Sequence, residues 1–327
     1  MATNTLTTDS VRRKFRKRLL AWYDGNKRDL PWRQDRDPYR VWVSEIMLQQ
    51  TRVAAVLDYY HRFLRRFPTV GKLAAAREAS VLAAWSGLGY YRRARMLHAA
   101  AKKIVAEPGG KFPASAGELC ELPGIGRYTA AAIASIAFAE PVAVVDGNVS
   151  RVLERIQGKT LGGEEVWREA EGLLHRSRPG DFNQAMMELG ATVCLPKQPN
   201  CLVCPVVELC VSRGQLSKPV KRPRQKKREI HYTLARRNRS VFLVQRPPEA
   251  SLMPSMWELP EIPNPAEVAG EPTFTLRHSI TVTDYTVRVR EGPLPEDLPG
   301  KWVARSRLNS MALTGLARKI LRAARVI

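Results

Sequence analysis

The sequence predicts a mostly α-helical domain followed by a smaller α+β domain. Its 327 residues are enough for about two domains. Up to about residue 215, apolar residues recur with the 3.6-residue period of amphipathic helices, for example at 80–84 and 94–104, and prolines separate the helical stretches. Beyond residue 228 this pattern gives way to alternating, β-branched segments typical of strands.

Residues 217–228 (SKPVKRPRQKKR) mark the boundary between the two patterns. They contain seven basic residues, no acidic residue and two prolines. Such a composition cannot build a core and favours an extended linker. We therefore predict domains at 1–216 and 229–327, joined by this linker. A DNA-tracking segment and a nuclear localisation signal fit the linker equally well.

The second domain is expected to hold strands near 230–235, 240–245 and 281–290. A helix is expected over 316–326. About 100 residues in this order indicate a small α+β domain.

The charge of the chain favours a polyanionic partner. Lys and Arg number 53 against 31 Asp and Glu, a formal net charge of +22. DNA or RNA is the simplest partner, while a membrane surface and a generally basic composition are weaker alternatives. The basic run 12–18 (RRKFRKR) has a helical pattern and faces phosphate or solvent. We see no apolar run long enough to span a membrane and no signal-peptide core, so an intracellular, membrane-free protein is expected.

Four of the five cysteines stand close together, as Cys194, Cys201, Cys204 and Cys210, with the spacing C-x6-C-x2-C-x5-C. Thiolate sulfur suits iron–sulfur clusters and zinc. Zinc sites more often pair two short C-x2–4-C units, so one loop with four cysteines favours a [4Fe–4S] cluster. Unrelated buried thiols are the simpler alternative, but three prolines in the stretch exclude a plain helix. The fifth cysteine, Cys120, is expected to be a small core residue, and a reducing compartment is expected.

The segment LPGIGRYTA (122–130) places Gly124 and Gly126 between two helical stretches. Glycine lets a backbone approach a ligand closely, and the amides of the helix expected over 128–139 favour a phosphate. A glycine pair before a helix also fits an ordinary tight turn.

The segment AVVDGNVSR (143–151) ends an apolar run at Asp146, where another helix is expected to begin. Asp146 fits a helix N-cap, and a helix N-terminus keeps a carboxylate ionised. The same carboxylate could stabilise a developing sugar cation, with Asn148 orienting it or a water. Cap and catalyst are equally consistent with the sequence.

Glu45 lies in an apolar helical run, among Val43, Ile46 and Met47. Desolvation there should raise its pKa and suit it to general acid catalysis near neutral pH. The alternative is a glutamate on the polar stripe of an amphipathic helix. Gln49 and Gln50 follow, and their amides could enter a duplex that has lost a base.

Several motifs occur in an order that resembles the endonuclease III and MutY family of DNA glycosylases, and within it the adenine-specific members. They cover about residues 30–210: PWR, SEIMLQQT, GLGYYRRARMLHAAA, LPGIGRYTA, VDGNVSRV, NQAMMELGATVC and the cysteine loop. The resemblance implies a helix-hairpin-helix glycosylase domain with a [4Fe–4S] loop. Endonuclease III relatives carry a nucleophilic lysine at the position of Tyr128. A tyrosine cannot form a Schiff base, so the match implies a monofunctional glycosylase.

The resemblance also implies roles for individual residues. Glu45 would protonate adenine, Asp146 would stabilise the sugar cation, and Tyr128 and Asn148 would support them. Gln49 or Gln50 would fill the vacated stack, Gly124 and Gly126 would hold the DNA backbone, and Lys197 would reach a phosphate. The substrate would be duplex DNA with adenine opposite 8-oxoguanine or guanine, bound by a monomer, and the cluster would serve structure and DNA docking.

The C-terminal domain resembles the MutT-like, Nudix-fold domain of that family, through VFLVQRP (241–247) and WELP (257–260). The catalytic signature R-E-x-x-E-E is absent, which implies a lesion-recognition module. The family's recognition loop is often H-x-F-S/T-H. In this chain His278 and Thr281 match that pattern, whereas Ile280 and Val282 replace the aromatic residue and the second histidine.

Three rival functions are weighed against this one. A bifunctional glycosylase and lyase conflicts with Tyr128 and with the C-terminal domain. A non-catalytic iron–sulfur DNA-binding protein leaves Glu45 and Asp146 without a task. A zinc nucleobase deaminase needs H-x-E, and none of the five histidines is followed by x-Glu.

Overall fold

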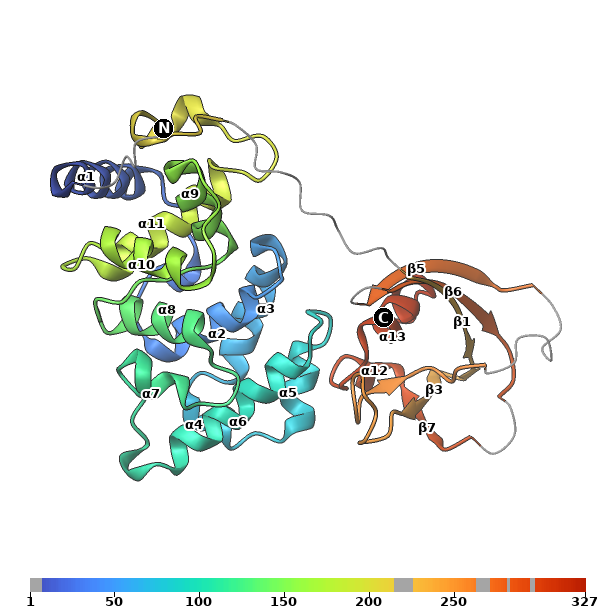
Figure 1. The fold of residues 1–327 in the computed structure, drawn as a ribbon. Helices are drawn as coiled ribbons and strands as arrows, with labels where there is room; N and C mark the ends of the chain where they lie inside the picture. Colours follow the sequence, from blue (N-terminus) through green and yellow to red (C-terminus); the bar gives the residue numbers. More distant parts are fainter. Residues whose placement is uncertain (1–7, 215–225, 263–270, 281–282, 295–297) are drawn as a thin grey trace. The chain divides into compact units, whose positions relative to one another are not determined.

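The computed structural model describes residues 8–214, 226–262, 271–280, 283–294 and 298–327 (Figure 1). By its internal contacts the chain forms two compact units. The first combines Met1–Arg52 with Ala100–Val220, and the second combines Val53–Ala99 with Lys221–Ile327.

The described residues up to Gly214 are helical, as the sequence predicts. Their helices are α1 (Asp9–Asn26), η1 (Pro31–Arg33), α2 (Pro38–Leu48), α3 (Val53–Arg66), α4 (Val70–Ala74), α5 (Glu78–Trp85), α6 (Arg92–Ala106), η2 (Pro108–Gly110), α7 (Ala116–Cys120), α8 (Arg127–Ala137), α9 (Gly147–Gln157), α10 (Gly163–Leu173), α11 (Pro179–Thr192), η3 (Cys201–Val203) and η4 (Val207–Leu209).

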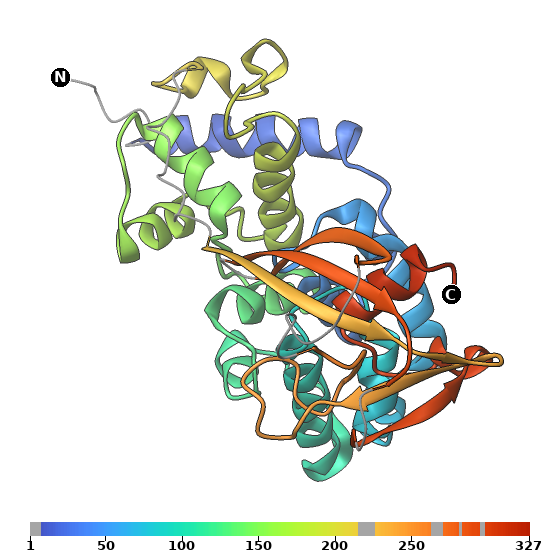
Figure 2. The same cartoon turned by 90° about the vertical axis from the view of Figure 1, so that its right-hand side faces the viewer.

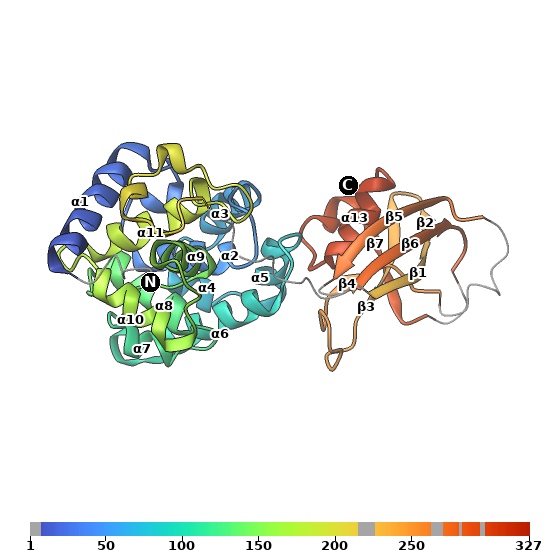
Figure 3. The ribbon, with the colours of Figure 1, turned by 45° about the horizontal axis from the view of Figure 1, so that its top comes forward.

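The core of the first unit gathers around α11. Phe182 and Met186 of α11 pack with Phe15 of α1 and Leu153 of α9, and all four are buried. Three of the cysteines in the 194–210 loop lie at the edge of this core. Figure 3 shows α1, α10 and α11 side by side. The apolar faces of these helices therefore hold the cysteine loop and the helix α9 in one block.

Local side chains fix where the helices begin and end. The Asp146 carboxylate accepts hydrogen bonds from the amides of Asn148 and Val149, and α9 begins at the next residue. Gly158 ends α9 in the left-handed conformation. Ser115 and Glu118 form a capping box at α7. The helix α8 ends at Ala137, two residues before the predicted end, where Ala139 has a φ of 57°.

The second unit contains two sheets built from β1 (Lys226–Leu234), β2 (Arg236–Arg237), β3 (Ser240–Gln245), β4 (Trp257–Glu258), β5 (Phe274–Ile280), β6 (Thr283–Glu291) and β7 (Gly300–Ala304), with α12 (Arg305–Leu308) and α13 (Gly315–Ala323). One sheet has the order β1-β6-β5, in which β1 and β6 are parallel. The other has the order β2-β3-β4, with β7 also paired to β3.

The helix α13 closes the core of this domain. Leu316, Ile320 and Leu321 pack with Val287 and Val289 of β6, and all of them are buried. Figure 2 shows the strands of the β1-β6-β5 sheet in front of this helix. The α+β character predicted for this part of the chain is confirmed.

Two details differ from the sequence-based expectations. Strand β1 begins at Lys226, so residues 226–228, the described part of the predicted linker, belong to a strand. Lys226, Lys227 and Arg228 pair in register with Thr283, Asp284 and Tyr285 of β6. Cys120 is exposed on α7, which corrects its expected place in the core, because Leu119 supplies the buried position there. None of the helices within the described ranges is long and apolar enough to cross a membrane.

Candidate active site

Glu45 lies in an apolar stretch of α2 and is buried. Only 6% of its surface is exposed. The Tyr128 hydroxyl of α8 donates a hydrogen bond to Glu45 Oε2 at 2.7 Å. Burial raises the pKa of Glu45 to about 7, against the opposing effect of the Tyr128 hydrogen bond, and the nearby charge of Asp146 raises it further. The carboxyl group is therefore poised to hold and release a proton near neutral pH.

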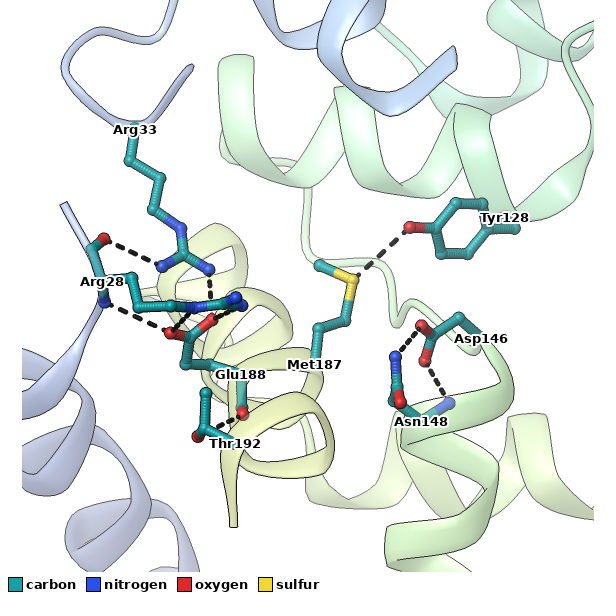
Figure 4. Close-up of polar contacts among 8 residues, drawn as sticks. All are labelled: Arg28, Arg33, Tyr128, Asp146, Asn148, Met187, Glu188 and Thr192. Atoms are coloured by element: carbon teal, nitrogen blue, oxygen red, sulfur yellow. Dashed lines mark hydrogen bonds and ion pairs between the residues drawn. The ribbon is translucent and has the colours of Figure 1, made fainter. Parts of the chain in front are cut away.

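Tyr128 stays protonated beside this carboxyl group. Burial raises its pKa well above the usual value, and the charge of Glu45 adds to the effect. Its hydroxyl also lies 3.5 Å from the sulfur of Met187 on α11 (Figure 4). Tyr128 thus serves as a hydrogen-bond donor from a fixed position.

Asp146 sits at the N-terminus of α9 with both oxygens engaged. Oδ1 accepts hydrogen bonds from the amides of Asn148 and Val149 at 2.9 and 2.7 Å. Oδ2 accepts a hydrogen bond from the Asn148 side chain at 2.9 Å. In Figure 4, Asp146 lies beside Tyr128 and Met187. The cap predicted from the sequence is present, and it directs a carboxylate toward the buried Glu45–Tyr128 pair.

Arg151 fixes the position of the Asn148 side chain. Arg151 donates hydrogen bonds to Asn148 Oδ1 at 2.8 Å, to the carbonyl oxygen of Gly190 at 2.8 Å and to that of Cys194 at 2.9 Å. A Cβ atom on Gly190 would lie 2.6 Å from Asn148 Cβ, so only glycine permits this approach. Side-chain contacts thus connect Asp146 with the start of the cysteine loop.

A buried ion pair adjoins the site and was not predicted from the sequence. Glu188, 1% exposed on α11, accepts hydrogen bonds from Arg28 Nε at 2.7 Å and from Arg33 at 2.8 Å. Burial alone would raise the pKa of Glu188, but hydrogen bonds from Arg28 and Arg33 hold it down to about 2. The charge of Arg33 also lowers the pKa of Glu45 slightly. Figure 4 shows Met187 between this ion pair and Tyr128.

Both partners of this ion pair lie in motifs of the sequence. Arg33 belongs to the PWR motif and Glu188 to NQAMMELGATVC. The motifs do not indicate that these two residues, separated by 155 positions, make contact.

The two glutamines at the end of α2 differ in their surroundings. Gln49 donates a hydrogen bond to the Thr129 hydroxyl of α8 at 3.2 Å. Gln50 is exposed and has a φ of 55°, which turns the chain sharply after the helix. Gln49 is thus tied to the helix that carries Tyr128, while Gln50 projects to solvent.

The glycine motif forms the turn of a helical hairpin. Gly124 has a φ of 76°, a conformation that favours glycine, and Gly126 is the N-cap of α8. The turn joins α7 to α8, as the sequence predicts. Since Gly126 has no side chain, the first amides of α8 remain open to an approaching ligand.

The four cysteines of the loop surround one small cavity. Cys194, Cys201, Cys204 and Cys210 line it with apolar neighbours, and its volume is about 30 Å³. All four are partly buried free thiols. Across the described part of the chain, no three His, Cys, Asp or Glu side chains are close enough to hold one metal ion. Four thiols gathered around one cavity are a donor set that suits an iron–sulfur cluster.

The remaining predicted DNA contacts lie elsewhere. Lys197 is exposed in the cysteine loop. His278 lies in β5, opposite Tyr285 of β6, and its pKa is lowered by burial and by the charge of Lys319. His278 belongs to the second unit, whereas Glu45 belongs to the first. Thr281 and Val282 lie outside the described residues.

Comparison with known proteins gives a consistent result. Residues 43–174 match the family described as "HhH-GPD superfamily base excision DNA repair protein". The chain is 52% identical over 229 residues to an adenine DNA glycosylase of Mus musculus, covering 64% of this chain and 44% of that protein. It is 42% identical over 307 residues to an adenine DNA glycosylase of Arabidopsis thaliana, covering 79% of this chain and 49% of that protein. The chain thus spans about half the length of these curated relatives.

Two solved structures show the same fold. A thermostable thymine-DNA glycosylase is 30% identical, with a TM-score of 0.58, and is covered over 96% of its length by 62% of this chain. An endonuclease III in a non-covalent DNA complex is 22% identical, with a TM-score of 0.54 and 96% coverage by 62% of this chain, and supports the fold alone. The helical hairpin, the buried glutamate and these matches together establish that the chain belongs to the HhH-GPD superfamily of base excision DNA repair proteins.

Proposed function

We propose that the protein is a monofunctional adenine DNA glycosylase, which hydrolyses the N-glycosidic bond of adenine opposite 8-oxoguanine or guanine in duplex DNA. The observation that carries the proposal is the Glu45–Tyr128–Asp146 constellation, with a proton-holding carboxyl group buried beside an ionisable carboxylate. The adenine DNA glycosylases of mouse and Arabidopsis provide the substrate class.

The first step would be protonation of the base. Adenine leaves its partner and enters the pocket, at a cost of a few kcal/mol for unstacking. Glu45, protonated because it is buried, gives its proton to adenine N7. The bond between N9 and C1′ then breaks, and its electrons move to the base, which leaves as neutral adenine. This is the acid step of glycoside hydrolysis applied to a nucleoside.

The second step would be capture of the sugar cation. The Asp146 carboxylate faces the positive charge that develops on C1′ and O4′, and it stabilises the cation electrostatically. Asn148 keeps that carboxylate in place through its bond to Oδ2. A water then attacks C1′ and loses its proton to the Glu45 carboxylate, which restores the acid and leaves an abasic site.

Tyr128 supports the proposal of a hydrolase without lyase activity. The residue offers a phenol with a raised pKa, which donates a hydrogen bond and has no amine to attack C1′. In this proposal its hydroxyl orients Glu45 and leaves water as the only nucleophile.

The buried Glu188, with the partly buried Arg28 and Arg33, supports a base pocket next to Glu45. Arginine fixed by a carboxylate presents its remaining N–H donors in a defined plane. Such donors suit the ring nitrogens of adenine, which accept hydrogen bonds. The proposed partner is accordingly DNA, bound by a monomer inside the cell.

We further propose that Cys194, Cys201, Cys204 and Cys210 hold a [4Fe–4S] cluster, which would supply a rigid structural anchor for the loop. Lys197 in that loop, the open amides behind Gly126, and Gln49 and Gln50 would contact the DNA. His278 and Thr281 would contact the strand with 8-oxoguanine.

The test is a single-turnover assay on duplex DNA with adenine opposite 8-oxoguanine, with half of each sample treated with alkali. We expect breaks in the adenine strand only after alkali, and none in a duplex with cytosine opposite 8-oxoguanine. Breaks without alkali would show lyase activity and contradict the role of Tyr128. No breaks from protein with four irons bound would reject the adenine glycosylase.

A further inference from the structure

The basic run at residues 12–18 takes no part in the site described above. It folds into α1, and three of its side chains line a groove that also includes the turn before α11. The groove is a cavity of about 830 Å³. The cationic residues around it are Arg13, Arg16, Lys17, Arg176 and Arg178.

The acids of this groove neutralise only two of its five cations. Asp24 pairs with Arg178 at 2.7 Å, and Glu171 lies 3.7 Å from Arg176. Arg13 and Lys17 are exposed and form no ion pair within the described ranges of the chain. Their spacing places them on one face of α1, where like charges repel each other.

Arg16 lies between these two cations and is fixed in place. Its guanidinium donates to the carbonyl oxygens of Leu173 and Gly172 at 2.8 and 2.9 Å. Burial lowers its pKa, and the charge of Arg12 lowers it further. The groove thus holds several positive charges close together in fixed positions. A bound anion would reduce the repulsion between them.

The lining favours phosphates over bases or an apolar peptide. Among the described residues that line the groove, His175 is the one aromatic ring and there is no Phe, Tyr or Trp, whereas single-stranded bases stack on such large aromatics and protein interfaces are rich in them. Leu20, Ala21 and Leu174 are its apolar members. A row of cations without Phe, Tyr or Trp anchors matches a DNA backbone, which is bound through its phosphates.

The groove is remote from the catalytic groups. Arg178 is the N-cap of α11 and Glu188 lies ten residues later, so about 15 Å of helix separates them at 1.5 Å per residue. In Figure 1 and Figure 3, α1 and α10 lie on the side of the first unit away from α2.

We propose that the groove between α1 and the turn before α11 binds the phosphate backbone of a second stretch of duplex DNA, apart from the stretch whose base enters the active site. This role rests on the proposed function. An enzyme that searches for rare mispairs stays bound to DNA more easily if a second site contacts one DNA segment while the protein transfers to another. DNA binding by the groove can nevertheless be measured without any excision.

The first experiment uses the double variant Arg13→Glu/Lys17→Glu in the full chain. The matched control is Arg65→Glu/Lys102→Glu, which reverses two exposed cations outside the groove. Affinity for undamaged duplex is measured against salt concentration. We expect the salt slope of the groove variant to fall by about two, one for each lost phosphate contact, and that of the control to stay near the wild type. Equal slopes in all three proteins, or the same fall in the control, would overturn the proposal.

The second experiment tests whether the site is separate. Protein with Glu45→Gln is saturated with a duplex that has adenine opposite 8-oxoguanine, and a labelled undamaged duplex is added. We expect the second duplex to bind, and the groove variant to weaken this binding about tenfold or more. If the second duplex does not bind, or binds the groove variant equally well, the groove does not hold DNA, and an acidic protein segment becomes its better occupant.

The excision rate separates the two proposals. With protein in excess, the groove variant should remove adenine within about twofold of the wild-type rate, because Glu45, Tyr128 and Asp146 lie on α2, α8 and the start of α9, outside the groove lining. A much slower rate would place the groove in the catalytic machinery and overturn the separate site. If the wild-type protein removes no adenine, the proposed function is wrong. The binding results would still show whether the groove binds DNA.

Discussion

At the scale of single residues, the partners of a buried carboxyl group decide whether its pKa rises or falls. Glu45 and Glu188 are both almost fully buried, yet their pKa values shift in opposite directions. Glu45 has one hydroxyl as its partner, so burial prevails, while Glu188 has two guanidinium groups, so ion pairing prevails. One group is thereby kept as a proton donor and the other as a fixed anion.

The substitution Glu45→Gln should abolish the proton transfer while keeping the shape of the pocket. We expect single-turnover excision to fall by about 10²- to 10⁴-fold, the usual contribution of a general acid and base. The wild-type rate should decrease as the pH rises through about 7, because the protonated form of Glu45 is then lost. Rates are measured from pH 5 to 9 in both proteins, with Glu121→Gln, an exposed glutamate, as the control. An unchanged rate in Glu45→Gln would refute its catalytic role.

The sequence predicted the catalytic candidates better than their surroundings. An apolar run around Glu45, and an apolar run ending at Asp146, are local features that periodicity can reveal. Asp146 was undecided between cap and catalyst, and the structure explains why, since the same carboxylate caps α9 and faces Tyr128. The partners of Glu188 could not be predicted, because they depend on how α11 packs against the segment after α1.

At the scale of elements, α9 and α11 together fix the position of Asp146. They approach so closely that a Cβ atom on Gly190 of α11 would lie 2.6 Å from Asn148 Cβ. Arg151 spans the same contact and reaches the carbonyl oxygens of Gly190 and Cys194. A displacement of either helix would therefore move Asn148, and with it the support of Asp146.

The substitution Gly190→Ala should displace Asn148, because the added Cβ would lie 2.6 Å from Asn148 Cβ and 3.1 Å from its backbone. We expect excision to slow by at least about tenfold and the melting temperature to fall, as for overpacking in a core, which costs about 1–3 kcal/mol. Gly117→Ala is the matched control, since its Cβ would meet only Ser115 Oγ at 4.0 Å. Normal excision by Gly190→Ala would show that Asn148 does not position Asp146.

The cysteine loop is held from both sides by other elements. Arg155 of α9 donates hydrogen bonds to the carbonyl oxygens of Leu195 and Pro196 at 2.7 and 3.0 Å. Arg18 of α1 pairs with Glu208 at 2.7 Å. The spacing of the cysteines predicted the loop. It did not predict that side chains of α1 and α9 would contact the loop.

Removal of one loop thiol by Cys204→Ser should lower the bound iron and sulfide and loosen the loop. We expect faster proteolysis between residues 194 and 214 and weaker DNA binding, because the loop would lose its anchor while α2 keeps Glu45. The exposed Cys120→Ser is the control and should retain iron. Full iron content in Cys204→Ser would contradict the assignment of the four ligands.

At the scale of the whole molecule, contacts do not follow the simple division at residue 216. Residues 53–99 group by contact with the C-terminal part of the chain, where Ser86 Oγ donates to the carbonyl oxygen of Leu313 at 2.7 Å. Composition and periodicity predicted helices followed by an α+β region, and both are present. They could not predict which helices join which unit, because that depends on tertiary contacts between distant residues.

In the proposed mechanism, the buried acid Glu45 protonates adenine at N7 before the glycosidic bond breaks. The most direct measurement compares single-turnover excision of adenine and of 7-deazaadenine, each opposite 8-oxoguanine. The two bases have the same shape, but 7-deazaadenine carries a C–H in place of N7 and cannot accept the proton. We predict similar binding of both duplexes and excision of 7-deazaadenine slower by about 10²-fold or more. Equal excision rates would contradict the role assigned to Glu45.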